Sequence, residues 1–222
     1  MFFIVSFPEL ASTNDHLKQH NCEYPFSTVI LAQHQTKGRG RFERIWQSDQ
    51  DLTFSILFPH GPNHGFIAPL AVVKALKAHA IPAEIKWPND VLVHGKKVCG
   101  ILVESVYEGN DAVADIVGIG VNVTEKKNLQ AKSTYVSLSR NELLTDILTR
   151  YEELLGLETK DLLNEIRKVF YLNGKTLQID GIMWDVDGVD EHGYLCIHHQ
   201  DQQRILKSEE ITLSSIYEKE QS

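Results

Sequence analysis

The feature that most constrains the fold is a change of pattern at residues 173–175, where the sequence reads NGK. Before this point, stretches typical of strands alternate with stretches that carry apolar residues at helical spacing. After it, strand-like stretches of roughly five residues are separated by Gly-Asp and Glu-His-Gly turns, without a helical run. We therefore expect a larger body of mixed helices and strands over residues 1–172 and a small β-barrel domain over residues 173–222.

Within the body, the apolar start MFFIVSFPEL predicts a first strand, and the Ser-Thr-Asn at residues 12–14 is typical of a helix start. STVILAQ and DLTFSILF read as strands on either side of a basic loop. HGKK predicts the turn of a hairpin. The expected strands and helices are at 27–33, 51–58, 83–86, 91–93, 98–105 and 112–123, and at 65–81, 140–156 and 159–171, respectively.

Charge narrows the possible partners. The formal net charge is -8, with 22 Lys+Arg against 30 Asp+Glu, which disfavours a general nucleic-acid or anionic-membrane binder. No stretch has the roughly 18 apolar residues that a spanning helix needs, and the start does not resemble a signal peptide. The three cysteines are far apart and form no paired motif. We therefore expect a cytoplasmic protein that binds neither DNA nor membrane.

The cations that remain are concentrated in TKGRGRFERIW, residues 36–46. Two glycines let this backbone approach a ligand closely, and arginine forks match phosphate oxygens. The spacing is that of neither a P-loop nor a dinucleotide fingerprint. Taken alone, the stretch is also compatible with a flexible, solvated connection.

A second stretch, IKWPNDVLVHGKKVCGILVES, covers residues 85–105. Pro88 disfavours helix before it and predicts a turn, which would gather Lys86, Asn89 and Asp90 at a strand end. The hairpin that follows would bring Lys96 and Lys97 back to the same rim. This is a plausible site for an anion with a metal ion, or equally a turn that merely joins two strands.

A third stretch, DIVGIGVNVT, has glycines at 118 and 120 inside a strand pattern, which indicates that a ligand or another backbone packs closely there. Other candidates are weaker. His16 and His20 lack a carboxylate partner in sequence, and His198 and His199 should point to opposite faces of a strand. Cys99 lies in an apolar strand and is expected to be buried and structural.

The three stretches in this order, with Ser12-Thr13-Asn14 ahead of them and GVDEHGYLCI behind, resemble the biotin protein ligase family. The resemblance covers nearly the whole chain. It implies an α+β catalytic domain with a mixed sheet over 1–172 and an SH3-like β-barrel over 173–222. Because Ser-Thr-Asn begins at residue 12, it also implies the monofunctional form without an N-terminal DNA-binding domain.

The resemblance implies an ATP-dependent ligase that converts biotin to biotinyl-5′-AMP with Mg²⁺, then transfers biotin to a lysine of a biotin carboxyl carrier protein of a biotin-dependent carboxylase. It leaves open whether the protein is a monomer or a homodimer. The implied roles are as follows: catalytic, Arg41, Lys97, Asp90 and Lys86; biotin-binding, Ser12, Thr13, Asn14, Gln35, Gly38, Arg39 and Gly100; ATP-binding, Arg39, Arg41, Arg44, Trp46, Lys97 and Asn122; metal, Asp90.

The sequence departs from the family at one point: GRGRFERIW has Phe42 where an arginine is usual and Glu43 where a glycine is usual. We expect activity to survive because Arg39, Arg41 and Arg44 remain. Three alternatives stay open: a lipoate or octanoate ligase of the same fold, a non-catalytic biotin-binding protein, and a nucleic-acid module that uses the basic loop. The acidic charge disfavours the last of these.

Overall fold

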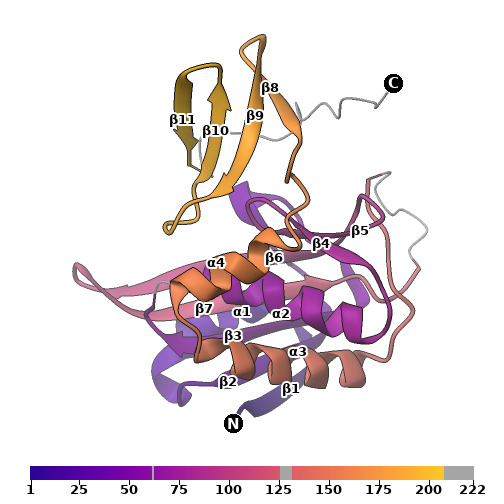
Figure 1. Cartoon of the computed structure of the whole chain (residues 1–222). Helices are drawn as coiled ribbons and strands as arrows, with labels where there is room; N and C mark the ends of the chain where they lie inside the picture. The colour runs from indigo at the N-terminus through magenta and orange to yellow at the C-terminus, as the bar shows by residue number, and fades with distance from the viewer. Residues whose placement is uncertain (62, 126–131, 208–222) are drawn as a thin grey trace.

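The protein is built on a seven-stranded sheet (Figure 1). The computed structural model describes residues 1–61, 63–125 and 132–207. The strands are β1 (Phe3–Leu10), β2 (Thr28–Gln35), β3 (Ser48–Pro59), β4 (Ala83–Lys86), β5 (Asp90–Val93), β6 (Lys96–Glu108) and β7 (Asp111–Val121), in the order β1-β2-β3-β7-β6-β5-β4. β1 pairs with β2 in parallel and every other pair is antiparallel. The expected mixed sheet is confirmed.

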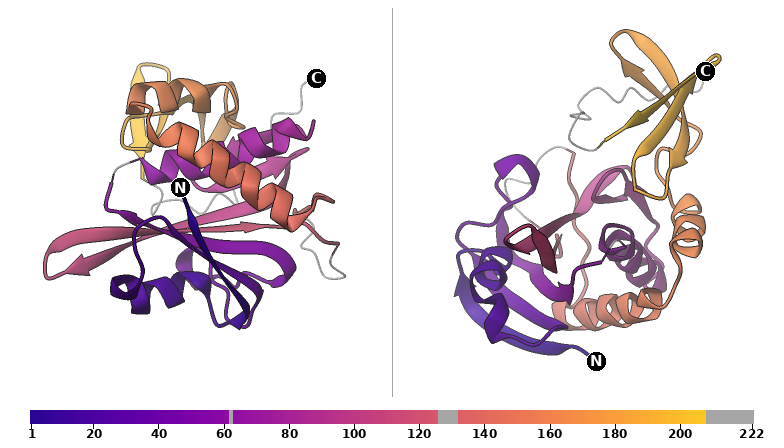
Figure 2. Two further views of the ribbon diagram at one scale, coloured as in Figure 1. Left: turned by 90° about the horizontal axis from the view of Figure 1, so that it is seen from below. Right: turned by 90° about the vertical axis from the view of Figure 1, so that its left-hand side faces the viewer.

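Helices cover both faces of this sheet (Figure 2). α1 (Thr13–His20) lies on one face, and α2 (His64–Ala78), α3 (Arg140–Leu155) and α4 (Thr159–Arg167) lie on the other. Alternation along β2 divides its apolar residues between the two sides. Val29 belongs to the core under α2, α3 and α4, whereas Ile30 packs with Leu17 of α1. Residues next to each other in sequence therefore face different environments.

The start of α1 follows the expected capping chemistry. The Ser12 hydroxyl accepts a hydrogen bond from the Asp15 N–H over 3.3 Å at the start of α1, as N-cap serines do. The last predicted helix was too long: 159–171 was expected, and α4 ends at Arg167. The reason is that the next backbone groups bind the edge of the sheet. The Ile85 N–H donates to Val169 O over 2.7 Å, and the Tyr171 N–H donates to Ile85 O over 2.8 Å.

The predicted hairpin at HGKK is confirmed between β5 and β6. His94 has φ 49° and Gly95 has φ 72°, the backbone of a tight turn whose twist matches the flanking strands. This turn sets the register in which Asp90 faces Gly100 and Leu92 faces Lys97. The hairpin thus returns Lys97 towards the strand end where Asp90 begins.

Beyond α4 lies a separate antiparallel sheet of β8 (Thr176–Ile179), β9 (Ile182–Val189), β10 (Leu195–His199) and β11 (Gln202–Leu206), in the order β11-β10-β9-β8. In Figure 1 it stands above the body. Its inner side chains, including Leu195 and Ile197, join the same buried cluster as the body. One bond between the two parts runs from the Trp87 indole N–H to Gly193 O over 2.8 Å. Residues 208–222 lie outside the described residues.

Two observations bear on the chain's surroundings. Among the described helices, none is both long and apolar enough to cross a membrane. The thiols of Cys22, Cys99 and Cys196 are all free. Cys99 is fully buried, and burial raises the pKa of its thiol well above the usual range, so it is structural, as expected.

Candidate active site

The basic loop, residues 37–46, folds into a tight hairpin between β2 and β3. The Gly40 N–H donates to Arg44 O over 2.7 Å and the Trp46 N–H donates to Gly38 O over 2.9 Å, and Arg39 pairs with Ile45. A short 3-10 turn, Arg41–Glu43, forms the tip. The backbone is therefore organised so that the loop carries its arginines as one unit.

The hairpin ends on Trp46, whose indole lies on two glycines of the central strands. Gly100 of β6 and Gly120 of β7 face each other in register. A Cβ on Gly120 would lie 2.5 Å from Trp46 Cε2, and one on Gly100 would lie 3.1 Å from Trp46 Cζ3. Any larger residue at position 120 would collide with the ring. The sequence indicated that a ligand or another backbone packs closely on β7; at Gly120 the group that does so is the Trp46 side chain.

The KWPND segment and the β5–β6 hairpin meet at the surface where the Trp46 ring lies on Gly100 and Gly120, which we call the floor of the site. Lys97 Nζ lies 2.6 Å from Asp90 Oδ1 and 5.6 Å from the centroid of the Trp46 ring. Lys86, at the end of β4, is the register partner of Asp90. Four of the predicted residues, from two separate stretches of the sequence, are thus brought together.

The Ser-Thr-Asn segment closes the other end of this floor. The Thr13 N–H and hydroxyl both lie within hydrogen-bonding distance of Gln35 Oε1, at 2.7 and 3.1 Å. Ser55 of β3 lies beneath, with its hydroxyl 2.7 Å from Thr13 Oγ1 and 2.5 Å from Asn14 Oδ1. All three hydroxyl and amide residues are buried. These polar groups form a connected wall that leads to Gln35, two residues before the basic loop begins.

Asn14 links this wall to a charge cluster. Its Nδ2 donates to Glu104 Oε2 over 2.8 Å, and Gly118 lies so close to its amide that a side chain there would clash. Arg39 Nη2 lies 2.5 Å from Asp15 Oδ1 and 3.1 Å from Glu104 Oε2. These contacts, the bond to Asp15 first, hold the pKa of Arg39 above its usual value.

Sequence reasoning missed Asp15, Ser55 and Glu104 as members of this site. Asp15 follows directly on the Ser-Thr-Asn helix start, and Ser55 and Glu104 lie in expected strands. Glu104 comes from β6 and Arg39 from the loop, 65 positions apart. Only the sheet order brings them together, so no local pattern indicates the contact.

The other loop cations lie further out. Arg41 is half-buried, and its guanidinium carbon is 5.0 Å from the centroid of the Phe42 ring. Arg44 is exposed, as are the neighbouring Phe42 and Ile45. Phe42 adopts φ 55°, a left-handed conformation that is uncommon for bulky residues. The tip therefore presents both charge and apolar surface.

Asn122 follows β7 and is buried. Its side-chain N–H donates to Thr134 O over 3.0 Å, and its backbone N–H donates to Val98 O over 2.8 Å. It therefore ties residue 134 to the strand ends, and its role beside adenosine stays a prediction. Within the described ranges, no group of three or more His, Cys, Asp or Glu residues is arranged to hold a metal ion.

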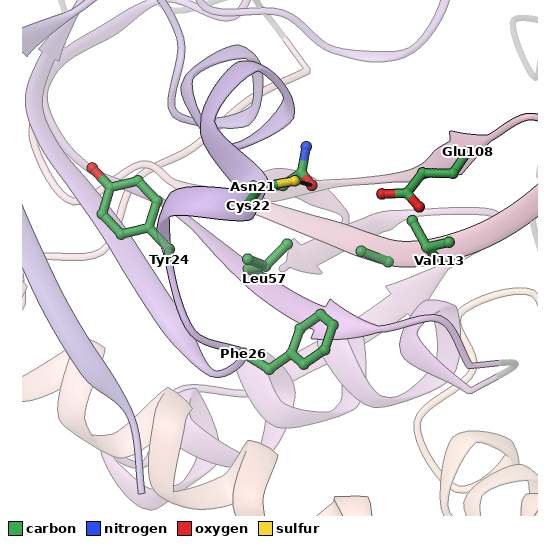
Figure 3. Close-up of a pocket in the computed structure, with 8 residues that line it drawn as sticks. Asn21, Cys22, Tyr24, Phe26, Leu57, Glu108 and Val113 are labelled. Carbon is green, nitrogen blue, oxygen red and sulfur yellow. Dashed lines mark hydrogen bonds between the residues drawn. The ribbon is translucent and has the colours of Figure 1, made fainter.

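A different hollow, of about 250 Å³, lies on the α1 face of the sheet (Figure 3). Its lining includes Cys22 and Tyr24, near the short 3-10 helix after α1, and Glu108 and Val113 from the β6–β7 hairpin. None of the predicted site residues lines it. The candidate active site is therefore the floor around Trp46.

Comparison with known proteins gives a family match. The model described as "Biotin/lipoate A/B protein ligase family" matches residues 6–122, more than half of the chain. This range contains every predicted site residue.

Individual relatives agree. The bifunctional ligase/repressor BirA of Bacillus subtilis is 38% identical over 117 residues, which are 49% of this chain and 36% of that protein. Biotin–protein ligase 1 of Arabidopsis thaliana is 28% identical over 190 residues, 76% of this chain and 52% of that protein. The chain thus spans between about a third and a half of these curated relatives. The Aquifex aeolicus biotin protein ligase, solved with biotin and ATP, superposes with TM-score 0.79 at 28% identity, covering 95% of this chain and 97% of that one.

Proposed function

The chain belongs to the biotin/lipoate A/B protein ligase family, and from this premise we propose that it is a biotin–protein ligase. It activates biotin with ATP as biotinyl-5′-AMP and transfers the biotinyl group to a lysine of a biotin carboxyl carrier protein. Support comes from the 28%-identical structural neighbour, which was solved with biotin and ATP. The family name also covers lipoate ligases, so the assay below includes that rival.

One observation carries the proposal: two separate cationic segments converge on one floor. The basic loop ends on Trp46, and Lys97 lies 5.6 Å from that ring. Adenylation must bring a carboxylate and a triphosphate into contact, and these two anions repel each other. Cations fixed beside the meeting point lower that barrier without any covalent enzyme intermediate.

In the first step, a biotin carboxylate oxygen attacks the α-phosphorus of ATP and the bond to the β-phosphate oxygen breaks, so pyrophosphate leaves. Arg41 and Lys97 are assigned to the α-phosphate and the carboxyl oxygens, and Lys86 shapes the anion site. Arg44 faces the triphosphate, while Trp46 and Asn122 border adenosine. The biotin site is formed by Ser12, Thr13, Asn14, Gln35, Gly38, Arg39 and Gly100.

In the second step, the neutral amine of the carrier lysine attacks the carbonyl carbon of the mixed anhydride. An amide forms, AMP leaves, and a proton must be taken from the nitrogen. Asp90 is assigned to this proton because it is the carboxylate on the floor, held by Lys97 at 2.6 Å.

Mg²⁺ would enter with ATP and would supply positive charge that offsets the charge of the phosphates. The residues fit this limited role, since Asp90 offers a carboxylate on the rim and a magnesium ion on a nucleotide commonly has one or two protein carboxylates. Asp90 is therefore the proposed protein ligand.

The domain arrangement belongs to the same proposal: a catalytic domain over residues 1–172 and an SH3-like β-barrel over 173–222. The four-stranded antiparallel sheet supports it. The free thiols support a reducing, cytoplasmic location. The protein would act as a monomer or homodimer without binding DNA or membrane.

The test is to incubate the protein with ATP, Mg²⁺ and a biotin carboxyl carrier domain, with biotin or with lipoate or octanoate, and to weigh the carrier. We expect a mass gain with biotin that depends on ATP. Arg41→Ala should lower adenylate formation or speed adenylate escape, and Lys97→Ala should impair adenylation more than carrier binding. Biotin binding without any mass gain would instead favour a sequestering protein, and a mass gain with lipoate alone would favour the rival ligase.

A further inference from the structure

Arg39 has a different electrostatic setting from the rest of the loop. Its guanidinium lies against two carboxylates, with Nη2 2.5 Å from Asp15 Oδ1 and 3.1 Å from Glu104 Oε1. Its Nε also donates to Asp15 Oδ1 over 3.2 Å. A guanidinium fork that binds a carboxylate through two nitrogens is a strong and directional contact.

The charges of this cluster balance. Lys18 Nζ lies 3.5 Å from Glu104 Oε1, so two cations face two carboxylates. A phosphate that approached Arg39 would meet the field of Asp15 and Glu104 as well. Arg39 is therefore poorly suited to attract a triphosphate.

The same cluster is well suited to hold the loop in place. Asp15 belongs to α1 and Glu104 to β6, two elements anchored in the body. Glu104 is further fixed by Asn14 Nδ2 at 2.8 Å, and Asn14 is buried. These two carboxylates thus face the 37–46 hairpin, which carries Arg39.

We propose that Asp15 and Glu104 are positioning residues that clamp Arg39, hold the 37–46 hairpin over the biotin end of the site, and leave ATP contact to the other cations. This inference rests on the proposed function. It removes Arg39 from the predicted ATP-binding residues and keeps it at the biotin end, next to Gly38.

The first test follows the loop itself and needs no catalytic activity. Limited trypsin digestion, with fragments identified by mass, reports how readily the chain is cut between residues 37 and 46. Asp15→Asn and Glu104→Gln should each raise this cleavage rate roughly three- to ten-fold, because each removes a charge-assisted contact. Lys18→Gln is the matched control: it touches Glu104 without touching the loop, and cleavage should be unchanged. Equal rates in wild type and both clamp variants would overturn the proposal.

The second test separates positioning from phosphate binding. Asp15→Asn and Glu104→Gln should raise KM for biotin, or the rate of adenylate loss, by roughly three- to ten-fold while KM for ATP changes less than about two-fold. Adding Asp15→Asn to Arg39→Gln should change nothing further, since the interaction is already gone. Arg39→Lys, which keeps the charge and loses the fork, should fall between wild type and Arg39→Gln.

Two results would contradict the clamp: full additivity of Asp15→Asn with Arg39→Gln, or a selective rise in KM for ATP. Failure of the proposed function is distinguishable from both. A wild-type protein that labels no carrier would refute the ligase, while the digestion would still decide whether the clamp holds the loop.

Discussion

At the scale of single residues, the site depends on two positions that have no side chain. Gly100 and Gly120 leave a flat area on the sheet, and the Trp46 indole fills it. The sequence indicated close packing near residues 118–120 but not its occupant. The occupant comes from a loop 74 positions earlier than Gly120, as the residue numbers show, and this contact depends on the pairing of β3 with β7.

Gly120→Ala should displace the indole, because the new methyl would lie 2.5 to 2.8 Å from three atoms of the ring. We expect a loss of about 1 to 3 kcal/mol in the free energy of unfolding, the usual cost of overpacking, and a raised KM for ATP. Chemical denaturation and steady-state kinetics measure the two effects. Gly65→Ala, where a Cβ meets nothing within 4 Å, is the control and should be neutral or slightly stabilising. A Gly120→Ala variant with wild-type stability and wild-type KM for ATP would show that the position of Trp46 does not depend on this glycine.

At the scale of elements, a buried histidine joins α2 to α3. His64 Nδ1 lies 2.9 Å from the Tyr151 hydroxyl, and the His64 ring stacks on Phe58 at 4.6 Å between centroids. Burial is the main cause that lowers the pKa of His64, against an opposing effect of Asp115. The two helices therefore pack best around a neutral imidazole.

This pairing predicts a pH dependence of stability. Because the pKa of His64 is lower in the folded than in the unfolded state, the unfolded chain takes up a proton first as the pH falls. The contribution of neutral His64 to the free energy of unfolding is complete above its pKa in the unfolded chain, near 6.5. It is lost as the pH falls below that pKa, with a slope of at most about 1.4 kcal/mol per pH unit. Urea unfolding between pH 7.5 and 5 should show a shallower loss for His64→Gln than for wild type. His192→Gln, at an exposed position, should behave as wild type, and parallel curves for all three proteins would refute the prediction.

At the scale of the whole molecule, the C-terminal sheet contacts the segment that carries Lys86 and Asp90. Trp87 lies between them and donates its indole N–H to Gly193 O over 2.8 Å. The turn that offers this carbonyl is held by Asp190, whose Oδ1 accepts from the N–H groups of His192 and Tyr194 over 2.9 and 2.8 Å. The small sheet thus supports the site from outside.

Trp87→Phe should lower stability by about 1 kcal/mol through the lost hydrogen bond and should also reduce the rate of adenylation. Trp184→Phe is a chemically matched control, because within the described ranges its buried indole nitrogen has no hydrogen-bond partner. That variant should change activity little. Thermal unfolding and pyrophosphate release provide the two readouts. If both variants behave alike, the bond to Gly193 does not couple the sheet to the site.

The sequence by itself determined the local features. The helix start at Ser12-Thr13-Asn14, the HGKK turn and the strand that follows Pro88 each depend on neighbours a few positions away, and the return of Lys97 towards the KWPND segment follows from one hairpin. Only the tertiary structure decided where Trp46 lies and that Arg39 binds Asp15 and Glu104. It also decided that α4 ends at Arg167, because the backbone that follows hydrogen-bonds to the edge strand β4. These contacts join residues far apart in the chain, and their geometry depends on sheet order and register, which are set by burying the whole core at once.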